Sequence, residues 1–410
     1  MLHKYLFDIQ LFIIYDVMKK TCLLFCFLLV SAFAYSQWTA LSAGISDGIL
    51  SVYFPGRTTG YAAGYNGTIL KTTDGFKTWT NLSDQKYQTS FSVFCTDTNT
   101  AFAVGGGILK TSDGGATWDT IARGTGSYLH SVCFTGANTG YAAGEAGTIL
   151  KTINGGTAWA SLSSGTTATL WSVFFTGADT GFVVGGLGTI LKTTNGGISW
   201  AVLSSGTINT LLSIHFTDAS TGYATGSGGT ILKTIDGGNT WAALPCGTTN
   251  VLMSVFFPVA DTGFVVGYNG TILKTNNSGT SWMTLSSGTT KDLYSVFFTD
   301  TKTGYAVGDS GIILKTTNGG GYPSGISDPL TASNSLVIFP NPSSTQITIE
   351  TSAIPAQSQL SIVNANGQQL ITHLINQTNT QIDISTLPRG VYFVRLTSDK
   401  NVAIGKFIKQ

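Results

Sequence analysis

Side chains that could support catalysis are few, and they stand outside the regular patterns of the chain. Two carboxyl groups that face each other across a sugar are the usual equipment of a glycoside hydrolase. A pair of this kind would have to come from the acidic residues that belong to no repeated motif, namely Asp47, Asp84, Asp119, Glu145, Asp292 and Asp309. Their spacing in the sequence selects no particular pair.

Other catalytic chemistries find less support. His130 and His215 stand far apart, and no His, Cys and acidic residues share the spacing of a metal site. The sequence matches the Gly-x-Ser-x-Gly spelling once, at 44–48, but no helical segment is expected after it, as a nucleophile elbow requires. We therefore expect neither a metal nor another cofactor, and a non-catalytic role is favoured.

The elements that must position these side chains form a repeat. The phrase Gly-Thr-Ile-Leu-Lys-Thr, complete or slightly altered, recurs with its lysine at Lys71, Lys110, Lys151, Lys192, Lys233, Lys274 and Lys315. The first interval is 39 residues and each later one is 41. Every unit, such as residues 170–203, holds short apolar runs bounded by Gly, Asp, Asn or Thr, which are strand and turn signals. Four strands in roughly 40 residues are typical of a β-propeller blade.

The last unit lacks its fourth strand, and the chain begins with an unmatched one. After Lys315 the repeat reaches Pro323 without a tryptophan, whereas Trp38 opens an isolated strand near the N-terminus. The fourth-strand tryptophans are then Trp38, Trp79, Trp118, Trp159, Trp200, Trp241 and Trp282. The sequence predicts an all-β fold: a seven-bladed β-propeller whose N-terminal strand closes the last blade, followed by a small C-terminal β-sandwich.

The turn before each tryptophan has the Asp-box form, as in Thr-Ile-Asp-Gly-Gly-Asn-Thr-Trp at 234–241. An Asp or Asn side chain can hydrogen-bond nearby amides there, and Gly supplies a positive φ. Asn replaces Asp in several copies, so a structural turn is expected and not a catalytic carboxylate. We expect each repeated lysine to have a structural role, on an outer strand beside the tryptophan of its blade.

Together with Ser-Val-x-Phe and Thr-Gly-Tyr-Ala-x-Gly, these phrases resemble the photosystem II assembly/stability factor-like propellers and the wider sialidase-type Asp-box propellers. The resemblance covers about residues 38–321 and implies the fold. The propeller region contains two arginines, Arg57 and Arg123. Neither the three-arginine clamp of sialidases nor the arginine-rich partner patch of the photosystem factor is therefore carried over.

Binding residues are expected where the copies disagree. In a propeller, the loops after the second and fourth strands share one face. Tyr65 and Tyr268 there could stack on a sugar or grip a protein, and Glu145 and Asp309 could hydrogen-bond it. The alternative is that these are ordinary solvated turn residues.

Two further sets depart from the repeat. Just before the first-strand serine, a variable and mostly large side chain occurs at Leu50, Phe91, His130, Trp171, Leu212, Met253 and Tyr294. Phe91, His130, Trp171 and Tyr294 are candidates for a ligand-contacting ring at the channel mouth, with packing between blades as the alternative. The segment 84–87 replaces the usual Ser-Ser-Gly-Thr-Thr; Asp84, Lys86 and Tyr87 are candidate partner contacts, unless the segment is a neutral insertion scar.

The first residues have the pattern of a secretory signal peptide. Residues 18–36 carry Met18-Lys19-Lys20, an apolar run and Ala34-Tyr35-Ser36, so cleavage before Gln37 is expected. Residues 1–17 are interpreted as a mis-assigned start. After cleavage, residues 37–321 are expected to form the propeller and residues 322–335 a linker that contains Gly, Pro and Ser. The mature chain is then expected to have no transmembrane segment.

Residues 336–410 follow a different β pattern. The run Val-Ile-Phe-Pro-Asn-Pro at 337–342 and the ending Lys-Phe-Ile-Lys at 406–409 resemble the type A C-terminal sorting domain of the type IX secretion system of Bacteroidota. The resemblance implies contact of residues 336–410 with that secretion machinery. It also implies export through the periplasm to the medium or the outer cell surface.

Composition limits the partners further. Charged residues make up 10% of the chain and the formal net charge is +1, so nucleic acid is not an expected partner. We expect a monomer that binds an extracellular protein or glycan without catalysis. The alternative is a divergent extracellular glycoside hydrolase with a carboxylate pair on the loop face.

Overall fold

The computed structural model describes residues 38–75, 77–83, 88–123, 126–321, 336–350, 358–364, 368–375, 377–397 and 402–410. The chain divides into two compact units, the first ending at Gly320 and the second beginning at Gly321. The predicted signal peptide, the linker 322–335 and the candidates Asp84, Lys86 and Tyr87 lie outside the described residues, and the predicted domain bounds remain predictions. Among the residues that are described, no helix has the length and apolar character needed to cross a membrane.

The described part of the first unit forms seven antiparallel four-stranded sheets, each with its strands in chain order except the last. The first three sheets contain β2 (Ile49–Tyr53), β3 (Gly60–Gly64), β4 (Ile69–Thr72), β5 (Thr80–Asn81); β6 (Ser90–Cys95), β7 (Ala101–Gly105), β8 (Gly107–Thr111), β9 (Asp119–Arg123); and β10 (Leu129–Phe134), β11 (Gly140–Gly144), β12 (Ile149–Thr152), β13 (Ala160–Leu162). The next three contain β14 (Leu170–Phe175), β15 (Gly181–Gly185), β16 (Ile190–Thr193), β17 (Ala201–Leu203); β18 (Leu211–Phe216), β19 (Gly222–Gly226), β20 (Thr230–Thr234), β21 (Ala242–Ala243); and β22 (Leu252–Val259), β23 (Thr262–Gly267), β24 (Ile272–Thr275), β25 (Met283–Leu285).

The seventh sheet joins the two ends of the repeat region. It contains β26 (Leu293–Phe298), β27 (Gly304–Gly308), β28 (Ile312–Thr316) and, beside β28, the N-terminal strand β1 (Thr39–Ser42). The register places Thr39 opposite Lys315 and Ser42 opposite Ile312. β1 is therefore the fourth, outermost strand of this sheet. In each of the other six sheets, the fourth strand directly follows the third strand in the chain.

Trp38 occupies the place of a fourth-strand tryptophan in this sheet. It is 1% exposed and meets Phe298 edge to face, with ring centroids 5.9 Å apart. A Cβ atom added to Gly320, in the turn after Lys315, would lie 3.3 Å from Trp38 Nε1. The equivalent atom on Gly197 would lie 3.6 Å from Trp200 Cζ2. The two tryptophans therefore occupy equivalent positions in their own sheets, each against a glycine of the Asp-box turn.

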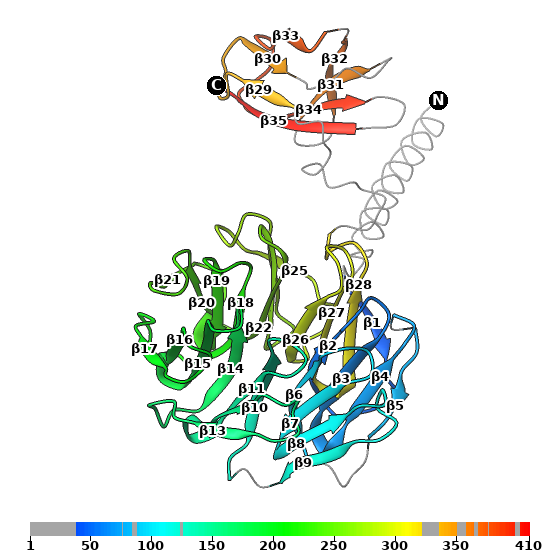
Figure 1. Ribbon diagram of the computed structural model, residues 1–410. Helices are drawn as coiled ribbons and strands as arrows, with labels where there is room; N and C mark the ends of the chain where they lie inside the picture. The colour runs from blue at the N-terminus through cyan, green and yellow to red at the C-terminus, as the bar shows by residue number, and fades with distance from the viewer. Residues whose placement is uncertain are drawn as a thin grey trace, which may run out of the picture. The chain divides into compact units, whose positions relative to one another are not determined.

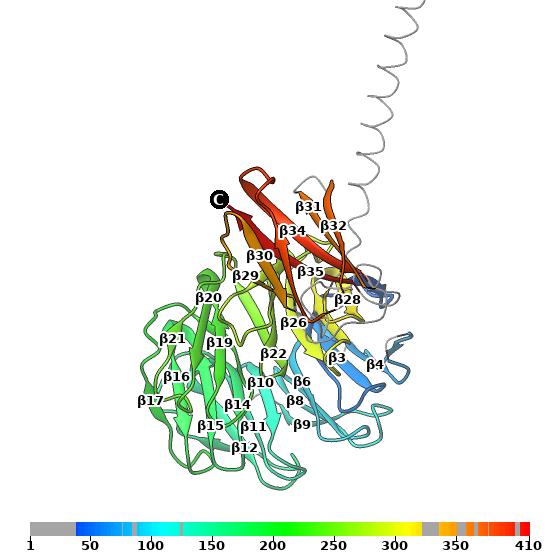
Figure 2. The same ribbon diagram turned by 90° about the horizontal axis from the view of Figure 1, so that it is seen from above.

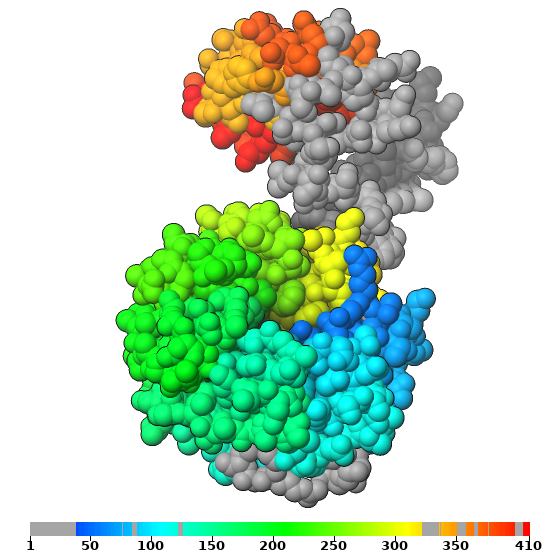
Figure 3. All heavy atoms as spheres, in the orientation of Figure 1, coloured from blue at the N-terminus to red at the C-terminus, as the bar shows by residue number. Residues whose placement is uncertain are grey.

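Neighbouring sheets pack face to face and are tied near the centre by serine hydroxyls. The amide of Val93 donates to Ser51 Oγ of the preceding sheet at 3.1 Å, and the same bond recurs from sheet to sheet. The amide of Val52 in the first sheet donates to Ser295 Oγ of the seventh at 3.4 Å. Figures 1 and 2 show the sheets following one another around a centre, and the blue start of the repeats lies against the yellow end in Figure 3. The predicted all-β propeller fold is confirmed.

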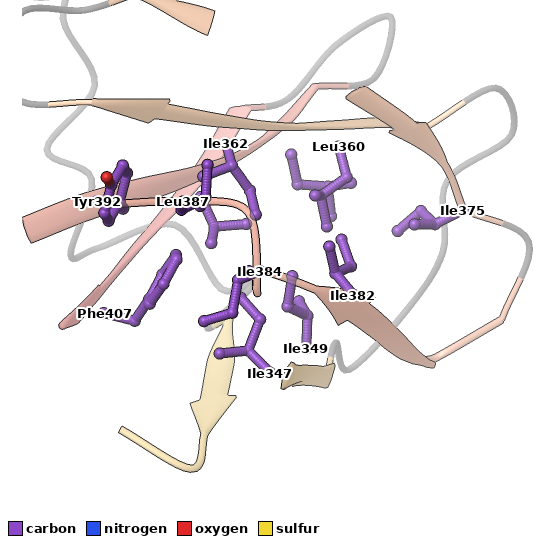
Figure 4. Close-up of a cluster of buried hydrophobic side chains, with 12 residues drawn as sticks. Ile347, Ile349, Leu360, Ile362, Ile375, Ile382, Ile384, Leu387, Tyr392 and Phe407 are labelled. Atoms are coloured by element: carbon purple, nitrogen blue, oxygen red, sulfur yellow. The ribbon is translucent and has the colours of Figure 1, made fainter. Parts of the chain in front are cut away.

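The second unit is a small β-sandwich in its described residues. One sheet contains β29 (Val337–Phe339), β30 (Gln346–Glu350) and β33 (Asn379–Asp383), and the other β31 (Gln359–Asn364), β32 (Gln369–Leu374), β34 (Gly390–Thr397) and β35 (Val402–Lys409). Alternate residues of β30 and β33 are buried, as a half-buried strand requires. Figure 4 shows Ile347, Ile349 and Ile382 of the first sheet facing Leu360 and Ile362 of the second.

Candidate functional site

The propeller has two kinds of loop, and those that carry the Asp boxes are hydrogen-bonded within themselves. Asp236 Oδ1 accepts from the amide of Thr240 at 3.0 Å, and Oδ2 accepts from its hydroxyl at 2.6 Å. These hydrogen bonds lower the pKa of Asp236 to about 2. Asn195 holds the amide of Ser199 in the same way at 3.0 Å, which agrees with the structural interpretation of the turn. We call this side of the propeller the turn face.

The repeated lysines also make contacts on the turn face, but the predicted aromatic neighbour, the tryptophan of the blade, was wrong. Lys151 Nζ donates to Gly196 O, in the Asp box of the following sheet, at 2.7 Å. It also lies 5.4 Å from the ring centroid of Tyr141. The aromatic partner is thus the second-strand ring and not the tryptophan of the blade, because the register sets Tyr141 directly opposite Lys151. The same cation–ring contact occurs at Lys71, Lys110, Lys192, Lys233, Lys274 and Lys315.

The opposite loops bring together positions at which the copies differ, and we call this side the loop face. Single 3-10 turns follow five of the second strands: η1 (Tyr65–Gly67), η2 (Glu145–Gly147), η3 (Gly186–Gly188), η4 (Ser227–Gly229) and η5 (Asp309–Gly311). The first amide of each turn donates to the loop before the first strand, as Tyr65 N does to Gly48 O at 3.0 Å and Asp309 N to Asp292 O at 2.9 Å. Both predicted loop sets therefore share one face.

Four of the predicted binding residues lie together on the loop face with Asp292, which had been named only among the acids for a carboxylate pair. We call this group the tyrosine–aspartate cluster: Tyr65, Tyr268, Asp292, Tyr294 and Asp309. They come from the first, sixth and seventh sheets. The Tyr294 hydroxyl donates to Asp309 Oδ1 at 2.8 Å, and its ring meets that of Tyr268 edge to face at 6.4 Å. Tyr65 and Tyr268 remain 37% and 36% exposed. The cluster thus joins open aromatic surface to carboxylates.

Gly48 allows Tyr65 to reach this cluster. A Cβ atom at Gly48 would lie 2.9 Å from Tyr65 Cδ2 and 3.4 Å from Asp309 Oδ1. The corresponding positions of other sheets carry side chains, for example Tyr128, Thr169 and Val251. Because Gly48 has no side chain, the Tyr65 ring can lie over the backbone beside Asp309.

The cluster changes the acidity of its phenols. Burial raises the pKa of Tyr294, and the hydrogen bond to Asp309 and nearby negative charge raise it further. Burial also raises the pKa of Tyr268, with smaller contributions from Asp292, Tyr65 and Asp309. Both phenols therefore stay protonated at neutral pH and can donate hydrogen bonds.

A second group, the histidine cluster, contains Phe91, Tyr128, His130, Glu145 and Trp171. The His130 ring lies 4.8 Å from Phe91 and 4.1 Å from Trp171 between centroids. The side chain is 9% exposed, and neither ring nitrogen has a hydrogen-bond partner among the described residues. Burial lowers the pKa of His130, while the charge of Glu145 opposes this effect. At this stretch of the channel mouth, the variable side chains pack against one another between sheets.

His215 lies on β18, three residues beyond the variable position Leu212, and is not part of either loop-face cluster. Its ring centroid is 5.4 Å from Phe174 and 5.1 Å from Phe256, which hold equivalent first-strand positions in the neighbouring sheets. Burial lowers its pKa to about 4. His215 therefore packs between the first strands of neighbouring sheets.

The structure therefore sorts the described candidates into two clusters and adds three residues that were not predicted to bind a ligand, although Asp292 had been named among the acids that could form a carboxylate pair. Asp292, Gly48 and Tyr128 all immediately precede the first residue of an inner strand. The available signal was their departure from the Thr found there in other copies, such as Thr169 and Thr210. Glu145 and Asp309 lie in the third and seventh sheets, which are not neighbours in the chain. Within the described ranges, no three His, Cys, Asp or Glu side chains are placed to hold a metal ion.

Solved structures with this architecture differ widely in role. The chain is similar to YCF48 bound to D1 peptide, with 21% identity over 70% of this chain and 99% of that one and a TM-score of 0.60. It is also similar to PorZ of the type IX secretion system from Porphyromonas gingivalis, with 13% identity, 89% and 59% coverage and a TM-score of 0.54. A xyloglucanase from Xanthomonas campestris shows 12% identity, 77% and 59% coverage and a TM-score of 0.57. These likenesses establish the fold alone.

Family comparisons are more specific. Residues 337–410 match the secretion system C-terminal sorting domain, as predicted from the resemblance. Residues 30–125, 199–288 and 239–354 match the photosynthesis system II assembly factor YCF48, and together they exceed half of the chain. Comparison with curated proteins finds no match. The chain therefore belongs to the family of the photosynthesis system II assembly factor YCF48, and it ends in a secretion system C-terminal sorting domain.

Proposed function

We propose that this protein is a non-catalytic binding propeller that the type IX secretion system exports to the medium or the outer cell surface. Its loop face holds a protein or a glycan. One observation carries the proposal: side chains that depart from the repeat gather on the loop face in two clusters, whereas the turn face repeats the same internal contacts. A side chain that recurs in every sheet serves the scaffold, so selectivity must come from the departures.

The chemistry of the loop face suits binding. Exposed tyrosines supply rigid, amphipathic contact surface, and such residues are frequent anchors of protein interfaces and sugar sites. The carboxylates and phenols of the tyrosine–aspartate cluster supply hydrogen-bond acceptors and donors beside them. A structure of YCF48 with a bound D1 peptide shows that a propeller of this family can hold a peptide, which supports a ligand-holding role here.

The test uses the exported protein on glycan arrays and in pull-downs with extracellular proteins. We expect one of these to identify a ligand, and the double variant Tyr65→Ala, Tyr268→Ala to lose it. Ile198→Ala is the matched control, because Ile198 is 80% exposed in an Asp-box turn of the turn face. If both assays find nothing, or if the control loses binding equally, the proposal fails.

Glycoside hydrolysis remains the alternative, and the xyloglucanase likeness is compatible with it at the level of fold. Activity on a panel of polysaccharides should be absent if the propeller only binds. Activity that persists through purification and disappears in Asp309→Ala or Glu145→Ala would replace the binding proposal.

Export has its own test. Deleting residues 336–410 should leave the propeller in the periplasm, because the sorting domain would be missing. Fractionation followed by immunoblotting measures this, and normal release of the truncated chain would contradict the export step while leaving the binding proposal open.

A further inference from the structure

We infer that the tyrosine–aspartate cluster receives a basic side chain, an arginine or lysine, from an extended segment of a protein partner. This ligand class rests on the binding role proposed above for the loop face. Three observations carry it: the charge of the face, the open aromatic surface, and the shape of the neighbouring hollow.

The charge of the described loop face is mainly negative. Its described turns and loops carry the acids Asp47, Glu145, Asp292 and Asp309 and the cation Lys291, and Arg123 ends strand β9 at the same edge. Lys291 Nζ donates to Ser310 Oγ at 3.0 Å. A partner segment with positive charge would therefore be attracted to this face.

The cluster carboxylates are engaged by neutral donors. Asp292 Oδ1 accepts from the amide of Asn269 at 2.8 Å, and Asp309 Oδ1 accepts from the Tyr294 hydroxyl at 2.8 Å. Each carboxylate keeps lone pairs for a further donor. A cationic donor is favoured over a sugar hydroxyl, because it adds the attraction between opposite charges to its hydrogen bond with the carboxylate.

The tyrosines add a second reason to favour a cation. A lysine or arginine over the face of an aromatic ring is attracted by the negative charge of that face. This chain already uses that contact on the turn face, where Lys71 lies 5.4 Å from the ring centroid of Tyr61 and also donates to a turn carbonyl. On the loop face, the exposed rings of Tyr65 and Tyr268 lie beside carboxylates. An incoming cation would therefore meet a tyrosine ring again, but with a carboxylate as its hydrogen-bond acceptor instead of a backbone carbonyl.

The surface beside the cluster is hollowed. A hollow of about 910 Å³ is lined by Asp47, Asn66 and Tyr128 among others. Asn66 follows Tyr65 in the chain and donates to Asp47 Oδ1 at 2.9 Å. The hollow therefore lies next to the Tyr65 side of the cluster and carries a third acidic group, Asp47. This extended surface suits a peptide better than a small free ion.

The experiment uses the exported full-length protein and a fluorescent, unstructured peptide with two arginines separated by glycines. Its comparison peptide replaces both arginines by citrulline, which keeps the shape and hydrogen-bonding atoms but removes the charge. Fluorescence anisotropy should show about tenfold tighter binding of the arginine peptide, and this preference should weaken between about 50 and about 500 mM NaCl.

Variants locate the interaction. Asp292→Asn with Asp309→Asn keeps the side-chain shapes and should weaken arginine-peptide binding about tenfold. Asp119→Asn, at an exposed aspartate that begins β9, should leave it unchanged. Equal binding of the two peptides, or an unaffected double variant, would overturn the inference.

A glycan ligand gives a different pattern. Neutral oligosaccharides would bind with little dependence on salt and would lose affinity in Tyr65→Ala, while the arginine peptide would not compete. That result overturns the basic-ligand inference and supports the proposed function. If the arginine peptide does not bind and the arrays and pull-downs also identify no ligand, both the basic-ligand inference and the proposed binding function are wrong.

Discussion

Aromatic rings serve opposite purposes on the two faces of the propeller. On the turn face, every described lysine of the repeat lies 5.4–5.7 Å from a second-strand Tyr or Phe ring. On the loop face, Tyr65, Tyr268 and Tyr294 lie among aspartates and keep open surface. The turn face has its cation–ring contacts within the chain, whereas the loop face presents rings and carboxylates to solvent. Changes on the turn face should therefore affect stability, and changes on the loop face should affect binding.

The largest expected effect concerns Trp38. Trp38→Ala removes a nearly fully buried ring from the niche beside Phe264, Phe298 and Gly320, so the free energy of unfolding should fall by about 3–5 kcal/mol. Urea denaturation followed by tryptophan fluorescence and circular dichroism measures it. Ile198→Ala, at an exposed turn-face position, should change stability by less than about 0.5 kcal/mol. An unchanged Trp38→Ala midpoint would show that the Trp38 ring does not stabilise the seventh sheet.

A matched pair of lysines tests the comparison directly. Lys151→Met removes the Nζ donor to Gly196 O and the cation over Tyr141, and should cost about 1–2 kcal/mol of unfolding free energy. Lys291→Met on the loop face removes one exposed contact to Ser310 and should have little effect. Equal losses from both variants would erase the distinction between the faces.

Acid titration should also act on the turn face. Hydrogen bonds lower the pKa of Asp74, Asp113 and Asp236 to about 2, from an ordinary value of 3.8. Since the folded-state pKa values lie below the unfolded ones, the stabilisation is present above about pH 3.8 and is lost as the pH falls through 2.

The triple variant Asp74→Asn, Asp113→Asn, Asp236→Asn keeps the turns, because Asn already serves in the other Asp boxes. Its thermal midpoint should vary less between pH 4 and pH 2 than that of the original protein, the difference depending on solvent screening at these exposed sites. Parallel profiles for the two proteins would mean that these carboxylates do not contribute.

The smallest effect on stability is expected from the loop face itself. Tyr65→Ala and Tyr268→Ala each remove a partly exposed ring and should change the free energy of unfolding by about 1 kcal/mol or less. Binding of a ligand, in contrast, should be lost. A large loss of stability would identify these rings as scaffold and would support the interpretation of ordinary packing or turn residues.

Much of the fold was predictable because its signals are local. The spacing of lysines and tryptophans, the β-branched runs and the Gly-containing turns predicted short strands in repeated units, and the structure has four-stranded sheets at those places. The Asp-box interpretation also followed from local chemistry, since Asn195 makes the hydrogen bond that Asp236 makes in its own turn. The aromatic partner of the lysines was missed, because it depends on the register between two strands, which sets Tyr141 opposite Lys151.

The candidate site could be predicted only in part. Variation among copies marked Tyr65, Tyr268, Tyr294 and Asp309 as separate candidates, because each departs from an otherwise repeated phrase. It did not show that Tyr65, near one end of the propeller sequence, lies beside Asp309, near the other. Nor did it mark Asp292 or the missing side chain of Gly48 as parts of the same surface.

The division has a physical reason. Strand propensity, turn chemistry and the repeat period act over a few neighbouring residues, so the chain alone specifies the type, number and order of its elements. Which of the residues that differ from the repeat lie together depends on the packing between sheets and on the pairing of β1 with β28. Both bring together residues that are far apart in sequence. Only the tertiary structure decides that tyrosines and aspartates from three sheets become one surface.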